Sequence, residues 1–186
     1  MSDASRLDRS QTALLVIDVQ ERLVQVMPDE LRERSLSRLA ALIAGAKALG
    51  LPVICTEQYP QGLGSTVPEI QAELEDVTRW PKTSFSCLGD PCIARAIEET
   101  GRTQWLVAGM ETHICVLQTI RDLREAGHQV HVIADACMSR NPLDYDIGIR
   151  RAGALGAALS STETALFELL GSAGGDAFKT ISRKIR

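Results

Sequence analysis

The sequence predicts an α/β fold of three layers: a Rossmann-like, mainly parallel sheet of about six strands with helices on both faces. Apolar runs of strand length alternate along the chain with segments in which apolar residues recur at helical spacing. Two of these runs, Ala13–Ile17 and Trp105–Ala108, are apolar throughout, which is typical of central parallel strands that are buried on both faces.

The length of 186 residues, with 45% hydrophobic residues and a formal net charge of −4, is typical of one globular domain. We expect this domain to span residues 1–186, with a flexible segment at 1–10 that contains no apolar signal region. The basic residues are dispersed and no apolar run reaches the ~20 residues that span a bilayer, so we expect neither a nucleic-acid nor a membrane partner. Five scattered cysteines, an odd number, favour reduced thiols and a cytoplasmic location.

The first part of the chain predicts a βαβ unit. The first strand is Thr12–Gln20, an amphipathic helix at Leu31–Leu49 ends at Gly50, and a strand follows at Pro52–Thr56. Residues Glu57–Pro68 contain two prolines and two glycines, which predicts a loop without regular structure that overhangs the ends of the strands.

The alternation continues through the rest of the chain. Pro81 argues against a central, fully paired position for the strand at Trp80–Ser86. The further elements that we expect are helices at 90–99, 112–126, 142–155, 162–170 and 176–185, and strands at 105–108, 129–134 and 156–160.

The segment Trp105–Val116 predicts a strand, a turn at Gly109 and the start of a helix. Thr112 stands where an N-cap residue belongs, and Cys115 then falls in the first turn. Unpaired amides and the positive end of the helix dipole favour a thiolate there and could bind an oxyanion. The segment therefore predicts a nucleophilic cysteine; the alternative is a small buried cysteine packed under a helix.

Two charged residues also fall at or beyond strand ends, where the ligand crevice of an open α/β sheet lies. Asp18 follows five apolar residues, which suggests a general base in the crevice, or else a helix cap or an ion-paired side chain. A nearby Lys82 would lower the thiol pKa of Cys115, although base rates favour a solvated surface lysine. Sequence spacing does not show whether the three residues meet. Gln58 and Tyr59 are candidate substrate contacts, or residues of an ordinary surface loop.

Three segments resemble the isochorismatase-like cysteine hydrolases, a superfamily that includes nicotinamidases, carbamoylsarcosine amidases and isochorismatases. They are Leu14–Gln20, Lys82 with the Thr-Ser-Phe-Ser that follows it, and Gly109–Val116. The resemblance runs from about Thr12 to Thr164, and the order and spacing of the segments make it specific.

Carried over residue by residue, the resemblance implies three catalytic residues. Asp18 accepts the Cys115 proton and later activates water, and Lys82 orients Asp18 and stabilises the thiolate. Cys115 attacks the substrate and forms a covalent intermediate. The resemblance also implies a cis peptide bond between Met110 and Glu111, which would aim the N–H groups of Glu111 and Cys115 into an oxyanion hole.

The chain departs from the metal-binding nicotinamidases, which have an Asp-x-His and a later His after the second strand. No histidine precedes His113, so we expect no metal site and no cofactor, and nicotinamidase activity is less favoured. His113, beside the nucleophile, either lines the substrate pocket or is structural. Thr56–Gly64 and Phe178–Ile181 are similar to the subgroup of isochorismatase-domain-containing proteins. Members of the family usually self-associate, which implies a homo-oligomer.

The leading hypothesis is a metal-independent cysteine hydrolase that acts on a small molecule with an amide-like C–N bond, because a thiol nucleophile suits acyl transfer. One alternative is hydrolysis of a vinyl ether such as isochorismate, which in this family needs the carboxylate and no thiol. Another is a non-catalytic binding or scaffold protein on the same fold. A redox role for Cys115, with Cys55 or Cys137 as the resolving thiol, also stays open.

Overall fold

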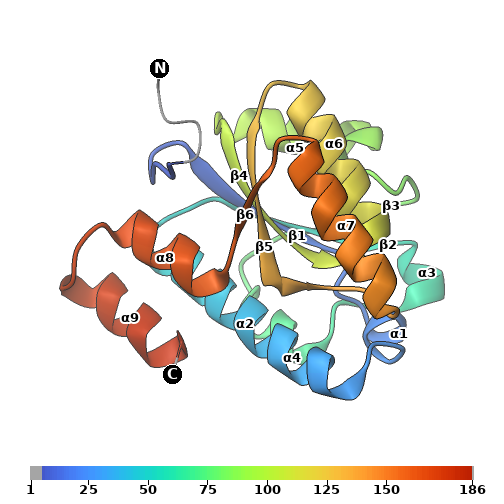
Figure 1. Cartoon of the computed structure of the whole chain (residues 1–186), viewed down its shortest axis with the longest axis horizontal. Coiled ribbons are helices and arrows are strands. Elements are labelled where there is room, and N and C mark those ends of the chain that lie inside the picture. The colour runs from blue at the N-terminus through green and yellow to red at the C-terminus, as the bar shows by residue number, and fades with distance from the viewer. Residues whose placement is uncertain (1–5, 186) are drawn as a thin grey trace.

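The computed structural model describes residues 6–185 and confirms the predicted α/β fold. Its six strands form one parallel sheet in the order β3-β2-β1-β4-β5-β6 (Figure 1). The strands are β1 (Thr12–Ile17), β2 (Val53–Gln58), β3 (Arg79–Lys82), β4 (Gln104–Met110), β5 (Gln129–Met138) and β6 (Ala158–Ser160). The strand order reverses between β1 and β4, which is where open α/β sheets bind their ligands.

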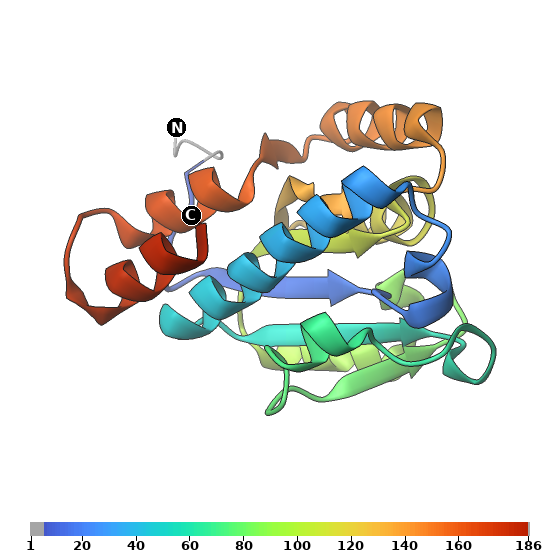
Figure 2. The same cartoon turned by 90° about the horizontal axis from the view of Figure 1, so that it is seen from below.

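Helices cover both faces of the sheet. One face carries α2, α8 and α9, and the other carries α5, α6 and α7 (Figure 1). Figure 2 shows α8 and α9 side by side next to α2. The helices are α1 (Glu21–Val24), α2 (Asp29–Ala48), α3 (Pro60–Leu63), α4 (Pro68–Gln71), α5 (Pro91–Glu99), α6 (Leu117–Glu125), α7 (Pro142–Ala154), α8 (Thr162–Leu170) and α9 (Gly175–Ile185). Within residues 6–185, no helix has the length and apolar character needed to cross a membrane.

Two apolar layers alternate along the central strand. Leu14 and Val16 of β1 belong to the layer under α2, and Leu15 and Ile17 belong to the layer under α5 and α6. Because both layers exclude water, β1 and β4 are buried at every residue, which explains the unbroken apolar runs Ala13–Ile17 and Trp105–Ala108 within them. Each large side chain buried in this way stabilises the fold by about 2 kcal/mol.

The segment after the second strand differs from the expected loop. β2 continues through Gln58, because Gln58 pairs with Lys82 of β3, and the short helix α3 begins two residues later. The expectation of an irregular segment from Glu57 to Pro68 is therefore wrong at its start and at α3. The place of β3 at the edge of the sheet agrees with the prediction from Pro81.

β5 is longer than expected and includes Asp135. It pairs with β4 on both sides of a bulge between Val107 and Gly109, and so reaches Met138. Gly109 has a φ of 121°, and a side chain there would collide with the carbonyl oxygen of Ile17. Glycine is therefore required where β1 and β4 approach each other beside the functional edge.

The segment expected to be flexible lies partly outside the described residues, at positions 1–5. The described remainder, residues 6–10, contacts the body of the protein. The amide of Leu7 donates to Glu168 Oε1 at 2.8 Å, and the amide of Asp8 donates to Gln104 Oε1 at 2.7 Å. Leu7 is also buried in the apolar layer under α2, so this part of the segment is anchored.

Candidate active site

Three predicted site residues gather at the carboxyl-terminal edge of the sheet. Asp18 directly follows β1, Lys82 is the last residue of β3, and Cys115 lies in the turn after β4. Asp18 has a left-handed backbone with a φ of 54°, a conformation that costs a non-glycine residue about 1 kcal/mol or more. Strain of this kind persists where the surrounding structure requires it, and here the surroundings are an ion pair.

Asp18 and Lys82 form this ion pair in the interior. Lys82 Nζ lies 2.6 Å from Asp18 Oδ2, and both side chains are 0% exposed. Lys82 is therefore not the solvated surface residue that base rates favour, because the loop after β3 folds back over its ammonium group. The carbonyl oxygens of Ser84 and Phe85 accept from Nζ at 3.2 and 3.1 Å. These partners offset part of the cost of removing the charge from water.

Burial and the neighbouring charge perturb the pKa of each group of the pair. Burial raises the pKa of Asp18, and the charge of Lys82, its hydrogen bond and the hydrogen bond from Thr56 oppose this rise. Thr56 Oγ1 donates to Asp18 Oδ1 at 2.7 Å. Burial alone would lower the pKa of Lys82, but the adjacent Asp18 charge outweighs it and the pKa is raised. Lys82 therefore favours the ionised form of the carboxylate beside it, against the effect of burial.

Cys115 is 6% exposed and lies in a π-helical turn, Thr112–Val116, that leads into α6. Its Sγ lies 4.0 Å from Gln58 Oε1. Burial raises the pKa of the thiol, the charge of Asp18 raises it further, and Lys82 compensates only in part. The expected lowering of the thiol pKa is therefore wrong for the resting site, because desolvation and a carboxylate outweigh the lysine and the helix end. The thiol needs a base before it can attack.

The helical segment around Cys115 begins without a side-chain cap within residues 6–185. Thr112, the expected N-cap, is instead the first residue of the π-helical turn, and its buried Oγ1 has no hydrogen-bond partner in the described part of the chain. The amides of Ile114 and Val116 donate to the carbonyl oxygen of Glu111 at 3.0 and 3.3 Å. Neither of these bonds uses the Cys115 amide.

Glu111 joins β4 to this turn. The Met110–Glu111 peptide bond is cis, in agreement with the family resemblance. The buried Glu111 carboxylate accepts from the Arg140 amide at 3.2 Å and pairs with the Arg140 Nε at 3.2 Å. This contact ties the turn to the segment after β5.

The three predicted pocket residues have different surroundings. Gln58 is buried and its side chain contacts Lys82 rather than solvent. Tyr59 is 54% exposed, with its ring close over Gly62. The Nδ1 of the half-buried His113 lies 3.0 Å from Ser139 Oγ. Tyr59 and His113 remain candidates for substrate contact.

Two polar residues of the site were not predicted. Thr56 contacts Asp18, and Gln20 binds the main chain of Gln58. The signal for Gln20 is a polar residue two positions after Asp18 at the end of an apolar strand, where a buried amide needs partners. Thr56 gives little signal, because threonine is common in strands.

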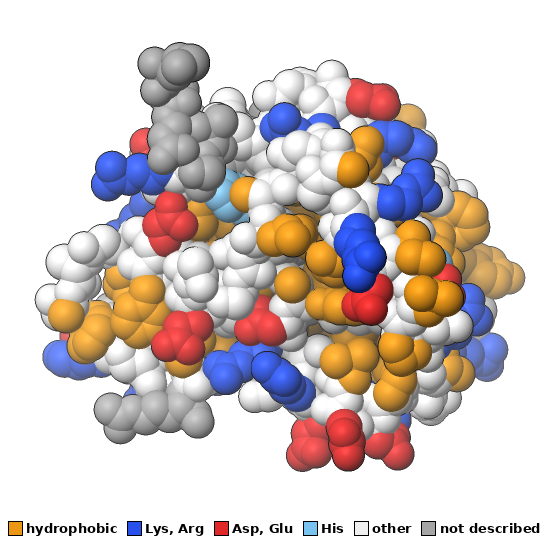
Figure 3. Space-filling model, viewed as in Figure 1, with side chains coloured by type: hydrophobic (Ala, Val, Ile, Leu, Met, Phe, Trp, Pro, Cys, Tyr) orange, Lys and Arg blue, Asp and Glu red, His pale blue; other side chains and the backbone are white. Residues whose placement is uncertain are grey.

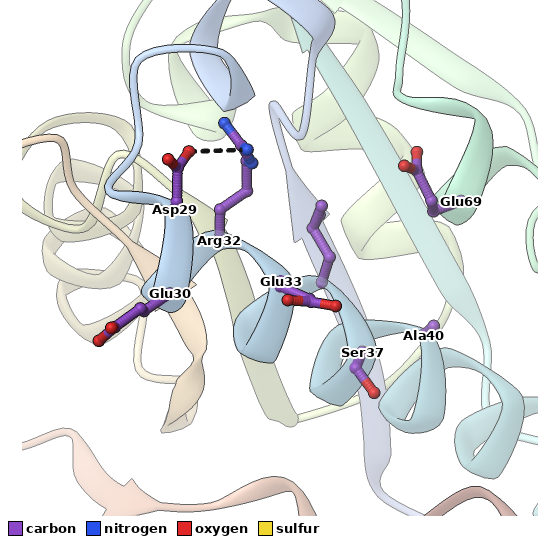
Figure 4. A pocket seen from close by; sticks show the side chains of 8 residues that line it. Asp29, Glu30, Arg32, Glu33, Ser37, Ala40 and Glu69 are labelled. Carbon is purple, nitrogen blue, oxygen red and sulfur yellow. Dashed lines mark ion pairs between the residues drawn. The ribbon is translucent and has the colours of Figure 1, made fainter.

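A separate groove lies away from this cluster. A groove of about 580 Å³ follows α2, and Figure 4 shows acidic side chains lining it, with Asp29 and Arg32 paired at 2.8 Å. None of its lining residues belongs to the Asp18–Lys82–Cys115 cluster. Its openness to solvent and lack of a buried titratable group make it a surface feature. Among residues 6–185, no three His, Cys, Asp or Glu side chains are placed to hold a metal ion.

Comparisons with known proteins agree with the resemblance. The model of the isochorismatase domain matches residues 12–164. Isochorismatase domain-containing protein 2 of Bos taurus is 36% identical over 174 residues, which cover 93% of this chain and 82% of that protein. A structure described as the MAR1 ribonuclease of Caenorhabditis elegans has a TM-score of 0.89 at 33% identity and covers 97% of this chain and 92% of its own.

A further solved structure is the YcaC gene product of Escherichia coli, described as an octameric hydrolase of unknown specificity. It has a TM-score of 0.87 at 27% identity, with 96% of this chain and 90% of that chain covered. The residues matched by the family model, 12–164, include Asp18, Lys82 and Cys115. The chain belongs to the isochorismatase domain family.

Proposed function

We propose that the protein is a cysteine hydrolase that cleaves an amide-like C–N bond in a small molecule, without a metal or cofactor. The observation that carries this proposal is the buried cluster in which Cys115 lies against the Asp18–Lys82 ion pair. A protonated thiol beside a buried carboxylate is a nucleophile with its base in place. Amide hydrolysis benefits from a covalent acyl intermediate, which only a nucleophile such as a thiol provides.

The proposed steps move one proton between Cys115 and Asp18. The thiol transfers its proton to the Asp18 carboxylate while the sulfur attacks the carbonyl carbon. The tetrahedral intermediate then expels the amine, which takes the proton from Asp18 and leaves a thioester. Asp18 next removes a proton from water, the hydroxide attacks the thioester, and Cys115 leaves as a thiol with that proton. Lys82 orients Asp18 and limits the cost of the negative charge on sulfur.

We further propose that the oxyanion of each tetrahedral intermediate binds the backbone N–H groups of Glu111 and Cys115. The carbonyl oxygen of Glu111 accepts from the amides of Ile114 and Val116, and no side chain within residues 6–185 caps that turn. Loss of one donor of an oxyanion hole typically raises the barrier by ~3 kcal/mol.

Self-association is part of the proposal. The E. coli relative is described as octameric. In this chain Leu143 and Ile147 of α7 are exposed, and Figure 3 shows apolar side chains gathered over that part of the surface. Light scattering coupled to gel filtration measures the mass of the particle, and a monomer at micromolar concentration would contradict this part.

Three other functions fit the fold less well. Vinyl-ether hydrolysis, as of isochorismate, does not use the thiol that this site positions. A scaffold protein has no need of a buried ion pair beside a thiol. The C. elegans relative is described as a ribonuclease, but here the net charge of −4 does not favour a polyanion, and Lys82 is 0% exposed.

The test is release of amine or ammonia from a panel of small amides, with Cys115→Ala and Cys92→Ala compared with wild type. Cys92 is exposed and lies outside the site, so its replacement serves as the matched control. We expect Cys115→Ala to lose at least ~10³-fold in kcat and Cys92→Ala to retain full activity. Intact mass after a rapid quench should show the acyl adduct in wild type only. Hydrolysis that survives in Cys115→Ala would contradict the proposal and favour vinyl-ether chemistry.

A further inference from the structure

Gln58 connects the parts of the site. Its Oε1 accepts from Lys82 Nζ at 2.6 Å and is the acceptor, at 4.0 Å, for the thiol of Cys115. Its Nε2 donates to the carbonyl oxygen of Thr83 at 2.8 Å. Both polar atoms of this buried side chain are therefore engaged by the protein, and a role other than substrate contact follows.

The partners of Gln58 determine which end of its amide faces the sulfur. The carbonyl of Thr83 can only accept, and the ammonium of Lys82 can only donate. The Nε2 must therefore face Thr83, and Oε1 must face Lys82 and Cys115. An oxygen acceptor at this position favours the S–H form of Cys115 and repels a thiolate.

The side chain of Gln20 forms hydrogen bonds with the main chain of Gln58. The Oε1 of Gln20 accepts from the Gln58 amide at 2.7 Å, and its Nε2 donates to the Gln58 carbonyl at 2.9 Å. The same Nε2 donates to the carbonyl of Gly64 at 2.7 Å. The buried Gln20 amide thus pairs with Gln58 as a neighbouring strand would, and Gln58 has little freedom to leave Lys82.

The protons of Lys82 are all taken by acceptors within the site. The side-chain acceptors are the shorter contacts, 2.6 Å each, and the two carbonyl contacts are 3.1 and 3.2 Å. The four acceptors are Asp18 Oδ2, Gln58 Oε1, Ser84 O and Phe85 O. Since an ammonium has only three protons, none remains for the sulfur of Cys115.

We infer that Gln58 is a positioning residue that keeps Cys115 protonated in the resting site. Its amide oxygen, held in place by Lys82, offers the thiol an acceptor and disfavours a thiolate. The inference rests on the proposed function, because it assigns Gln58 a role in the same site. A thiol held in this way reacts slowly with electrophiles until a substrate occupies the site.

Labelling with iodoacetamide tests the inference, with rates for each cysteine from mass spectrometry and the exposed Cys92 as internal reference. Gln58→Met keeps the length of the side chain and removes the oxygen acceptor that faces the sulfur. A fall of about one unit in the thiol pKa gives about tenfold more thiolate with about threefold lower intrinsic reactivity. The labelling rate of Cys115 should therefore rise about threefold.

Comparison with Gln58→Glu separates this effect from a change in access, because that variant keeps the size of the side chain and reverses the expected direction. Acceleration in both variants would show that substitution of Gln58 merely opens the site, and it would overturn the inference. An unchanged rate in Gln58→Met would overturn it as well.

A second variant tests the inference if Gln58→Met does not fold. Gln58→Glu keeps an oxygen toward Lys82 and adds a negative charge facing the sulfur, so labelling should slow at least about threefold. An unchanged or faster rate contradicts the inference. Gln25→Met replaces an exposed glutamine at the same edge of the sheet and should leave the rate unchanged.

The two proposals fail separately. Amide hydrolysis that survives Cys115→Ala overturns the proposed function, whatever the labelling rates are. Hydrolysis that needs Cys115, together with labelling that ignores Gln58, overturns only the positioning role.

Discussion

Two neighbouring helical segments begin at the same edge of the sheet in opposite ways. α7 begins after Asn141, whose Oδ1 accepts from the amide of Leu143 at 2.9 Å, and Leu143 is 64% exposed. The segment that carries Cys115 begins without a side-chain cap within residues 6–185, and its first turn is largely buried. The two segments pack directly, with Gly148 of α7 against the backbone of His113.

The two helix starts differ in what they contribute: one contributes to stability and the other to the chemistry of the site. A capped and exposed helix start satisfies its own amides, and its cap is worth ~1 kcal/mol of stability. A buried start without a cap keeps amides available for a ligand, and here it lies beside the Asp18–Lys82 ion pair instead of water. We therefore expect substitutions at the start of α7 to change stability alone, and substitutions around Cys115 to change the chemistry.

The largest effect should come from breaking the ion pair. Asp18→Asn leaves the buried charge of Lys82 without its partner, so the free energy of unfolding should fall by ~3–5 kcal/mol at neutral pH. Urea unfolding measures this loss. Adding Lys82→Met to the same chain removes the unpaired charge and should restore most of the stability but none of the activity. A loss below ~1 kcal/mol in Asp18→Asn would show that the pair is not buried as described.

The next effect is the pH dependence of the labelling rate of Cys115. Because its pKa is raised, the thiolate fraction is small and grows as the pH rises. Iodoacetamide labelling of Cys115 should therefore accelerate about tenfold per pH unit from about pH 7 to 9 without a plateau. A plateau below about pH 8.5 would mean that the thiol titrates like a free cysteine or below it.

A smaller effect is expected at the cap of α7. Asn141→Ala removes the acceptor for the Leu143 amide, so the free energy of unfolding should fall by ~1 kcal/mol. The labelling rate of Cys115 and the turnover of substrate should not change. A change in either would show that the start of α7 takes part in the chemistry.

The smallest effects distinguish two glycines of α7. A Cβ at Gly148 would lie 3.1 Å from the Cα of His113, whereas a Cβ at Gly153 meets nothing within 4 Å. Gly153→Ala should stabilise the protein by ~0.5–1 kcal/mol through helix propensity. Gly148→Ala should gain less, because it pushes α7 away from the turn of Cys115, and it should lower turnover. Equal behaviour of the two variants in thermal unfolding and in turnover would show that this contact is not restrictive.

The sequence predicted the sheet well because its central strands are buried on both faces. β1 and β4 each contain an unbroken apolar run, which is typical of a strand buried on both faces. Prediction was weaker at the edge, where β2 continues into a segment rich in proline and glycine. Pairing with β3 extends β2 there, and this pairing cannot be predicted from the local sequence.

In the candidate site, too, the sequence predicted some features and missed others. Cys115 at the start of a helix and Asp18 at the end of an apolar strand are local signals, and the family resemblance added Lys82. The burial of Lys82 could not be predicted, because it depends on Asp18, which lies 64 positions away in the sequence. Most lysines lie at the surface, but the ion pair with the buried Asp18 carboxylate allows Lys82 to be buried.

The sequence by itself determined the fold class and the family, and it proposed three candidate site residues, because apolar periodicity and motif spacing are properties of the chain alone. Only the tertiary structure decided the electrostatic state of the thiol. The helix start and the lysine argued for a lowered pKa, but desolvation and the Asp18 charge raise it. The place of Gln58 between Lys82 and Cys115 was decided in the same way, since it depends on a contact across 57 positions of sequence. Solvent exclusion and through-space charge depend on which distant residues meet, and spacing along the chain does not encode them.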